Sequence, residues 1–240
     1  MNILITGSSS GIGQQLAKDY LGQGHTVYCC GRNQQSLEKL RSEYPDQARP
    51  LVFDIQDLED CLRASKDVQE LDLLILNAGT CEYIDANNFN AESFARVMTI
   101  NVCGTGNCLQ ALLPKLSAGS TLALVGSSSS FLPLPRAEAY GASKAAIEYL
   151  AKTLSISLKP QGIHVSYIAP GFVETPLTDL NDFPMPMQVD VQFASAKIRS
   201  GLGKRRRLIH FPRLFTGALR LLGRLPLGLQ FALVGRTLRQ

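Results

Sequence analysis

Short apolar runs alternate with helical patterns through the first 170 residues of this 240-residue chain. Apolar runs cover residues 3–5, 26–29, 51–53, 73–76, 121–125 and 165–168, and helical patterns end near residue 21 and cover 36–44, 94–116 and 137–158. Such continuous apolar runs are typical of strands that are covered on both faces, and strands that alternate with helices form parallel sheets. We therefore predict an α/β fold, a single doubly wound Rossmann-like domain with a parallel sheet and helices on both faces.

A glycine-rich turn separates the first predicted strand from the first predicted helix. It has the sequence Thr6-Gly7-Ser8-Ser9-Ser10-Gly11-Ile12-Gly13. Glycines let the backbone turn tightly and approach an anion closely, and the start of a helix offers free N–H groups and a positive dipole end. An ordinary Gly/Ser loop has the same composition, but the position between a strand and a helix favours a pyrophosphate-binding turn.

Tyr140 and Lys144 form a Y-x-x-x-K pattern within the predicted helix 137–158. Residues four apart share one face of a helix, so the phenol and the ammonium can point into the same cleft. A free tyrosine has a pKa of about 10 and is a poor base at neutral pH, whereas a nearby cation lowers that pKa. Two helix-surface residues would give the same pattern, but together with the glycine turn it indicates an acid–base pair.

Several motifs occur in the order that is typical of one family. They are the T-G-x-x-x-G-x-G turn, the triplet Asn77-Ala78-Gly79, the Y-x-x-x-K pattern and the P-G-x-V-x-T segment that starts at Pro170. In these motifs the chain resembles the single-domain members of the short-chain dehydrogenase/reductase family, from residue 1 to about residue 178. The resemblance implies an oxidoreductase that moves a hydride between a nicotinamide cofactor and a small carbonyl or alcohol substrate.

The end of the second predicted strand indicates which nicotinamide cofactor binds. An acidic residue about 20 positions beyond the glycine turn would bind the ribose hydroxyls of NAD, but here Arg32 follows the strand and no carboxylate does. A guanidinium suits a phosphate, so we predict NADP(H) with Arg32 at its 2′-phosphate; a solvated loop arginine is the alternative. The resemblance implies that Asp54 binds the adenine amino group, and Asp57 is the better candidate for a helix cap.

The resemblance also implies a complete catalytic set, Asn101, Ser127, Tyr140 and Lys144. Ser127 would polarise the carbonyl, Tyr140 would exchange the proton, Lys144 would hold the nicotinamide ribose, and Asn101 would hold a relay water. Four serines in a row leave Ser128 as an alternative to Ser127. No motif implies a metal. The implied cofactor-binding residues are Gly7, Ser9, Ser10, Gly11, Ile12, Gly13, Arg32, Asp54, Asn77, Ala78, Gly79, Tyr140, Lys144, Pro170, Gly171, Val173 and Thr175.

Charge divides the chain into two predicted parts. Residues 1–196 carry 13 Lys/Arg and 20 Asp/Glu, whereas residues 197–240 carry 11 Lys/Arg and no acidic residue. We predict a catalytic domain over residues 1–196, with a substrate lid at about 177–196, and a basic helical C-terminal extension over 197–240. The extension fits peripheral contact with anionic lipid and access to lipophilic substrates, or a helical pair packed over the substrate cleft. Sparse aromatic residues argue against nucleic-acid binding.

The remaining expectations concern location, assembly and a rival function. No secretory signal pattern is present, so we expect a cytoplasmic protein, peripheral to the membrane if the extension binds lipid, with its six cysteines reduced. Family members pair through the two long helices, which implies a homodimer or homotetramer. A catalytically silent NADP-binding sensor or membrane-docking protein is the alternative to an enzyme, and the complete catalytic set favours the enzyme.

Overall fold

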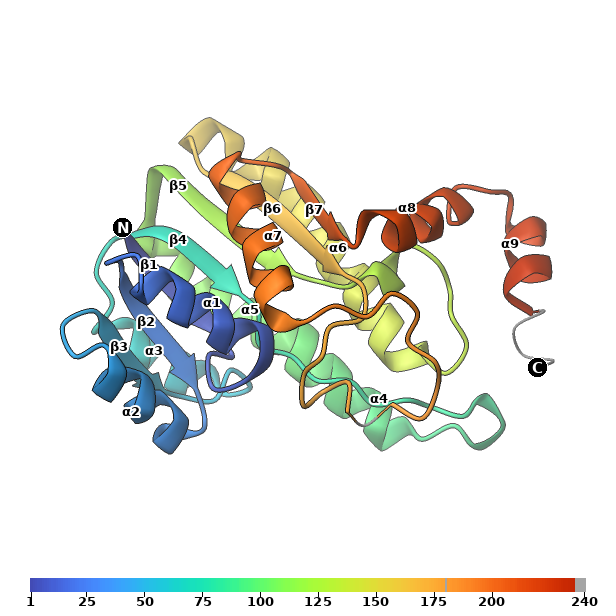
Figure 1. Cartoon of the computed structure of the whole chain (residues 1–240), viewed down its shortest axis with the longest axis horizontal. Helices are drawn as coiled ribbons and strands as arrows, with labels where there is room; N and C mark the ends of the chain where they lie inside the picture. Colours follow the sequence, from blue (N-terminus) through green and yellow to red (C-terminus); the bar gives the residue numbers. More distant parts are fainter. Residues whose placement is uncertain (180, 236–240) are drawn as a thin grey trace.

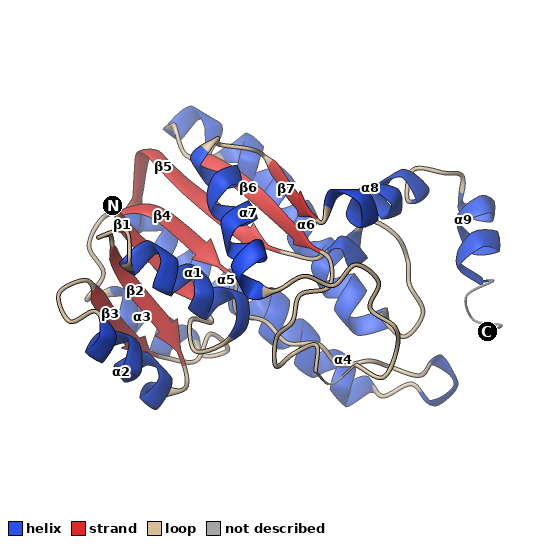
Figure 2. Cartoon of the chain, viewed as in Figure 1, coloured by secondary structure: helices blue, strands red, loops and turns tan. Residues whose placement is uncertain are grey.

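The computed structural model describes residues 1–179 and 181–235. Within these ranges the strands form one sheet in the order β3-β2-β1-β4-β5-β6-β7, and every neighbouring pair is parallel (Figure 2). The order reverses beside β1, as in a doubly wound fold. The strands are β1 (Asn2–Thr6), β2 (Thr26–Gly31), β3 (Ala48–Val52), β4 (Leu71–Leu76), β5 (Leu116–Val125), β6 (His164–Pro170) and β7 (Leu208–Phe211).

Helices cover both faces of the sheet (Figure 1). One face packs against α1, α2 and α7, and the other against α3, α5 and α6. The helices are α1 (Gly11–Leu21), α2 (Gln34–Glu43), α3 (Leu58–Ser65), α4 (Ala91–Met98), α5 (Gly104–Leu112), α6 (Glu138–Ser157), α7 (Val191–Gly203), α8 (Arg213–Leu222) and α9 (Leu227–Val234).

Alternation along the strands divides the core into two layers. Successive side chains of a strand point to opposite faces, and in β1 Leu4 belongs to one apolar cluster while Ile3 and Ile5 belong to the other. All three side chains are fully buried. The prediction of a parallel sheet covered on both faces is confirmed, and each of the six predicted strands is present. All six cysteines are free thiols, as predicted.

The predicted helix 94–116 is interrupted. It comprises α4, a π-helical turn over Thr99–Cys103, α5 and a short 3₁₀ turn over Leu113–Lys115. Leu116, placed by the prediction at the helix end, instead begins β5. Asp57 caps α3 by accepting hydrogen bonds from the backbone N–H groups of Glu59 and Asp60, which confirms its predicted capping role.

The C-terminal part is not the uniformly helical extension that was predicted. Residues 208–211 form β7, which pairs with β6 and buries Ile209 and Phe211 under α7. Helix α7 runs across the predicted boundary between residues 196 and 197 and packs on α1. These segments complete the sheet because β6 is a buried strand that requires cover on its second edge. Residue 180 of the predicted lid and residues 236–240 of the predicted extension lie outside the described residues.

Candidate active site

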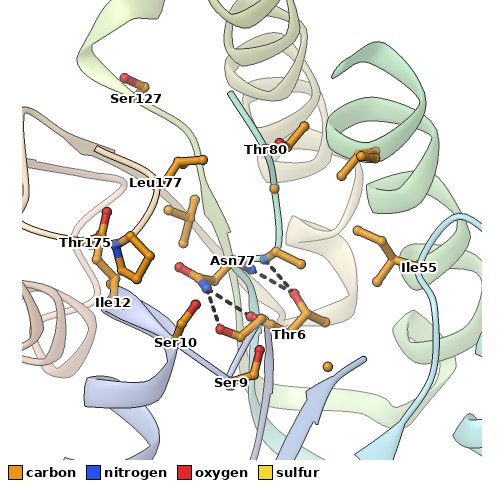
Figure 3. Close-up of a pocket in the computed structure, with 18 of the residues that line it drawn as sticks. Thr6, Ser9, Ser10, Ile12, Ile55, Asn77, Thr80, Ser127, Thr175 and Leu177 are labelled. Carbon is orange, nitrogen blue, oxygen red and sulfur yellow. Dashed lines mark hydrogen bonds between the residues drawn. The ribbon is translucent and has the colours of Figure 1, made fainter. Parts of the chain in front are cut away.

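A cavity of about 360 Å³ lies at the carboxyl ends of the parallel strands, where open α/β sheets bind their ligands. The glycine turn after β1, the ends of β2 to β6 and the start of α6 surround it (Figure 3). Among the residues of the sequence prediction, the cavity wall includes Gly7, Ser9, Ser10, Gly11, Ile12, Arg32, Asp54, Asn77, Ala78, Gly79, Ser127, Tyr140, Lys144, Pro170, Gly171, Val173 and Thr175.

The glycine turn adopts a backbone that only glycine tolerates easily. Gly7 and Gly11 have φ angles of +72° and +54°, in the left-handed region. A Cβ on Gly13 would overlap the carbonyl oxygen of Gly7, so the first turn of α1 can pack this closely only without a side chain there. Gly13 therefore shapes the turn from behind, although it is not part of the cavity wall.

Thr6 joins the glycine turn to the end of β4. Its hydroxyl accepts hydrogen bonds from the backbone N–H groups of Asn77 and Ala78, at 2.9 and 3.0 Å. The Asn77 side-chain amide donates to the carbonyl oxygen of Thr6 at 3.0 Å (Figure 3). Three bonds thus fix the two loops that flank the switch point of the sheet. Thr6 is the first residue of the T-G-x-x-x-G-x-G motif, but the motif alone did not indicate that its hydroxyl joins the two loops.

Arg32 lies at the carboxyl end of β2 with 70% of its side chain exposed. Its Nη1 is 3.7 Å from Oδ2 of Asp54, which follows β3. An ion pair this exposed contributes little to stability, so the guanidinium remains available to an anion. Asp54 also accepts hydrogen bonds from the Gln56 backbone and side chain, which orders the loop beneath it.

Asn101 lies in the π-helical turn between α4 and α5 and is 1% exposed. Its Nδ2 donates to the Thr80 carbonyl oxygen and to the Ser143 hydroxyl, both at 2.9 Å, and its Oδ1 accepts from the Thr80 N–H at 2.8 Å. The π-helical turn interrupts the predicted helix at Asn101, and such turns often occur at functional sites. Asn101 does not line the cavity itself. It bonds to Thr80, which lines the cavity from the loop after β4, and to Ser143 on α6, the helix that carries Tyr140 and Lys144.

Tyr140 and Lys144 both face the cavity from the first half of α6. The Lys144 Nζ donates to the carbonyl oxygen of Val125 at 3.1 Å and lies 5.5 Å from the centre of the Tyr140 ring. Burial lowers the pKa of Lys144 to about 8, and the Cys81 thiol acts in the opposite direction. A small rise in pH above neutrality therefore converts the Lys144 ammonium group to its neutral amine form.

The expected lowering of the Tyr140 pKa is not found. Burial raises the pKa of this phenol above its ordinary value, the Cys81 thiol adds to the increase, and the Ser127 hydroxyl opposes it. Desolvation is the largest cause, and the Lys144 Nζ donates its hydrogen bond to Val125 and not to the phenol. Tyr140 is consequently a neutral phenol at neutral pH, which is the form that donates a proton.

Tyr167 organises the serine run that follows β5. Its hydroxyl donates to Ser130 Oγ at 2.9 Å and accepts from the Ser127 N–H at 3.3 Å. Ser127 lies in the cavity wall, whereas the buried Ser128 does not. A Cβ on Gly126 would overlap the Tyr167 hydroxyl, so this close approach requires glycine. Sequence analysis missed Tyr167, which lies on β6 within an apolar run typical of core residues.

The segment after β6 closes the cavity on the side of the glycine turn. Thr178 Oγ1 donates to the Val173 carbonyl oxygen at 2.6 Å and accepts from the Thr175 N–H at 3.0 Å. The Thr175 methyl group faces Gly11, where an added Cβ would approach it to 3.1 Å. The segment therefore packs directly on the glycine turn and is shaped by its own hydrogen bonds.

A hydrogen bond and an ion pair connect the next part of this segment to two neighbouring loops. The Tyr83 hydroxyl donates to Asn181 Oδ1 at 2.8 Å, and Arg136 forms a two-bond ion pair with Asp182, at 2.8 and 3.1 Å. Phe183 packs edge-on against Tyr83, with ring centres 5.2 Å apart. These contacts join residues 181–183 to the loops after β4 and before α6.

Two features are absent from the described residues. No group of three or more His, Cys, Asp or Glu side chains in residues 1–179 and 181–235 is arranged to hold a metal ion. No helix in the same ranges is long and apolar enough to cross a lipid bilayer.

Comparisons with known proteins point in one direction. Residues 1–182 match the family model described as short chain dehydrogenase. An uncharacterized oxidoreductase of Staphylococcus epidermidis is 33% identical over 79% of this chain and 85% of its own. An NADPH-dependent 1-acyldihydroxyacetone phosphate reductase of Saccharomyces cerevisiae is 32% identical over 75% of this chain and 64% of its own. A short chain dehydrogenase from Burkholderia cenocepacia, solved with NADP, has a similar fold, with a TM-score of 0.86, 23% identity, and coverage of 97% and 96% of the two chains.

Proposed function

The chain belongs to the short-chain dehydrogenase family, and from this premise we propose that it is an NADP(H)-dependent oxidoreductase that moves a hydride between its cofactor and a carbonyl or alcohol. One observation carries the proposal. Ser127, Tyr140 and Lys144 line the same cavity as the glycine turn. A proton donor and a turn suited to the pyrophosphate of a dinucleotide therefore face the same cavity.

The cavity fits a dinucleotide on its own geometry. The left-handed Gly7 and the close packing at Gly13 leave the start of α1 uncovered by side chains, which suits a pyrophosphate. Arg32 is exposed beside Asp54 at the end where the adenosine ribose would lie, and its charge suits a 2′-phosphate. The cofactors of the yeast relative and of the Burkholderia structure support NADP(H) as the nucleotide.

The proposed chemistry assigns one task to each residue. The cofactor, when bound, supplies the hydride for carbonyl reduction. Ser127 and Tyr140 donate hydrogen bonds to the carbonyl oxygen, and Tyr140 transfers its proton to that oxygen. Lys144 holds the nicotinamide ribose and returns a proton to Tyr140. Burial raises the pKa of the Tyr140 phenol, so at pH 7 this residue holds the proton that carbonyl reduction consumes.

We propose an apolar carbonyl compound as the substrate class, with residues 177–196 as its cover. Phe183 contacts both Phe172, on its own segment after β6, and Tyr83, in the loop after β4, so the three rings form a chain of contacts. Tyr83 is close enough to Cys81 and Tyr140 that both contribute to raising its pKa, after burial as the main cause. A carbonyl bound at Tyr140 would therefore have aromatic rings beside its carbon chain.

Helix α6 offers a surface for self-association. Tyr149 and Ile156 lie on the same face of α6, two turns apart, and are 72% and 75% exposed. We propose that α6 pairs with α6 of a second copy to form a homodimer. Sedimentation velocity would test this: the wild type should sediment as a dimer and an Ile156→Glu variant as a monomer, and a monomeric wild type would refute the pairing.

The experiment that tests the enzyme proposal is a cofactor consumption assay. Purified protein is mixed with NADPH or NADH and a panel of aldehydes and ketones of increasing chain length, and loss of reduced-nicotinamide absorbance is followed. We expect turnover with NADPH, weaker turnover with NADH and a preference for longer carbon chains. NADPH binding without turnover on any carbonyl would instead support a catalytically silent sensor.

A further inference from the structure

Helices α8 and α9 extend away from the sheet at the end of the described chain (Figure 1). They expose large apolar side chains that would normally be buried in a water-soluble domain. We call this set the apolar tip. It consists of Leu214 and Leu221 on α8, which are 76% and 65% exposed, and Leu227, Leu229, Phe231 and Leu233 on α9, which are 64%, 53%, 61% and 40% exposed.

Helix α8 has three distinct faces. Leu214, Ala218 and Leu221 are exposed and follow an i, i+4, i+7 spacing, so they form one outward apolar stripe. Thr216, on another face, is fully buried and bonds to His210 and Pro212. The outward apolar stripe is thus a different face of α8 from the one that packs on the protein.

A basic stripe lies beside the apolar one. Arg213 and Arg220 are exposed and follow an i, i+7 spacing on α8, about a quarter turn of the helix from the leucines, and the exposed Arg224 lies in the turn that follows α8. None of the three forms an ion pair with an acidic residue in the described ranges of the chain. Residues 197–240 contain no Asp or Glu at all. The charge of the three arginines is therefore available to an anionic surface.

Helix α9 is apolar on nearly every side, yet only Gln230 within it is buried. Gln230 Nε2 donates to the carbonyl oxygens of Leu225 and Gly223, at 2.7 and 3.2 Å, which fastens α9 to the end of α8. A helix that is apolar all round is normally enclosed by protein or lipid. The contacts hold the start of α9 against the turn that follows α8, while its leucines and phenylalanine remain exposed.

We propose that α8 and α9 dock this chain on an anionic lipid surface, with the apolar tip in the headgroup–acyl boundary and the arginine stripe at the phosphates. Adjacent apolar and basic faces on short helices are the features of interfacial membrane binding. The two helices have 10 and 8 residues, too few to span a bilayer. Phosphate headgroups supply the negative charge that the arginines lack within their own segment.

A second copy of the chain is a poorer occupant of the same surface. A two-fold contact brings the same patch of both copies together. Arg213, Arg220 and Arg224 would then face their own counterparts, and the described part of the segment offers no carboxylate to separate them. Charge therefore favours lipid over self-association at the tip.

Docking at the tip also affects the neighbourhood of the cavity. The Phe215 ring, on the inner side of α8, lies 5.5 Å from Phe172, and Phe172 lies 6.1 Å from Phe183. Phe172 and Phe183 lie on the segment after β6, and the residues between them include Pro176 to Thr178, which line the cavity. A docked protein would hold this segment close to the lipid surface, where apolar carbonyl compounds concentrate.

Vesicle flotation of the full-length chain tests the proposal. Protein is mixed with vesicles of phosphatidylcholine alone or with about one third phosphatidylglycerol, and the fraction that rises through a density gradient is measured. We expect flotation only with the anionic vesicles, and weaker flotation when ionic strength is raised. Replacement of Arg220 or Arg224 by Gln should each lower the partition coefficient by roughly fivefold.

Matched substitutions separate docking from folding and from self-association. Leu214→Glu and Phe231→Glu should lower flotation at least tenfold, whereas Phe89→Glu, at a site of similar exposure to Phe231, should leave it unchanged. Unchanged NADPH binding shows that the variants are folded. Equal flotation with neutral and anionic vesicles, no flotation of the wild type, or tip variants that float like the wild type would overturn the proposal. Tip variants that become monomers and a wild type that ignores vesicles would assign the surface to a second copy.

Discussion

Asn101 and Thr80 are joined by two hydrogen bonds of opposite sense. The Asn101 amide donates to the Thr80 carbonyl oxygen at 2.9 Å and accepts from the Thr80 N–H at 2.8 Å. Because the same amide also donates to Ser143 on α6, it links the end of β4 to the helix that carries Tyr140 and Lys144. Asn101 is thus a positioning residue for the site, and its relay-water role stays a prediction.

An Asn101→Ala substitution should destabilise the protein and distort the site. It removes three hydrogen bonds and leaves two backbone groups of Thr80 without their partner, at a cost of about 2–4 kcal/mol in the free energy of unfolding. Asn107→Ala, which removes a half-buried asparagine that bonds to Ile55, should cost about 1 kcal/mol. Urea denaturation of both variants checks the difference, and equal losses would contradict the positioning role.

The serine run offers a paired test of register. Ser127 lines the cavity and Ser128 does not, so Ser127→Ala should lower kcat/KM by roughly 100-fold or more. Ser128→Ala should change it by less than about threefold, because the hydroxyl is buried away from the cavity. Steady-state kinetics on one carbonyl substrate decide between them. A larger loss in the Ser128 variant would move the catalytic role one residue along the chain.

Cofactor selectivity should depend on Arg32. An Arg32→Ala variant loses the charge beside Asp54 and should bind NADPH about 10- to 100-fold more weakly, with little change for NADH. Arg41→Ala is the matched control, because Arg41 is similarly exposed and lies 4.0 Å from Glu38. Titration calorimetry with both nucleotides measures the effect. Equal weakening for NADPH and NADH would argue against contact with the 2′-phosphate.

Lys144 should make the stability of the cofactor-free protein depend on pH. Its folded-state pKa is about 8, below the ordinary value of 10.5, so between these pH values the unfolded chain binds more protons and the contribution of Lys144 to the free energy of unfolding rises with pH. Below pH 8 its unfavourable contribution is complete. A Lys144→Met variant should therefore gain most over the wild type below pH 8.

The gain should shrink by on the order of 3 kcal/mol toward pH 10.5. Denaturant midpoints of both proteins measured across this range give the difference, in which the contributions of titrating groups that do not interact with Lys144 cancel. A difference that does not vary with pH would contradict the lowered pKa.

The glycine turn, the first six strands and many of the cavity-lining residues could be predicted because each has a local signal. Gly7 and Gly11 occupy a turn between a strand and a helix, and continuous apolar runs mark the buried strands. Tyr140 and Lys144 share a helix face by spacing alone. These features depend on neighbours in the sequence, which a pattern can represent.

The rest depended on contacts between distant parts of the chain. β7 has four residues between a run of basic residues and Pro212, and only its pairing with β6 defines it as a strand. Tyr167 looks like any buried residue of β6 until its hydroxyl meets Ser127 and Ser130. The raised pKa of Tyr140 likewise follows from burial, which the Y-x-x-x-K spacing does not report.

The most direct test of the proposed enzyme is carbonyl reduction by Tyr140→Phe beside the wild type, with NADPH as cofactor. The substitution removes one hydroxyl and keeps the ring that packs near Lys144. The account predicts turnover by the wild type, a loss of roughly 100- to 10,000-fold in kcat for the variant, and NADPH binding within a few-fold in both. A variant that turns over as fast as the wild type would contradict the assignment of Tyr140 as the proton donor.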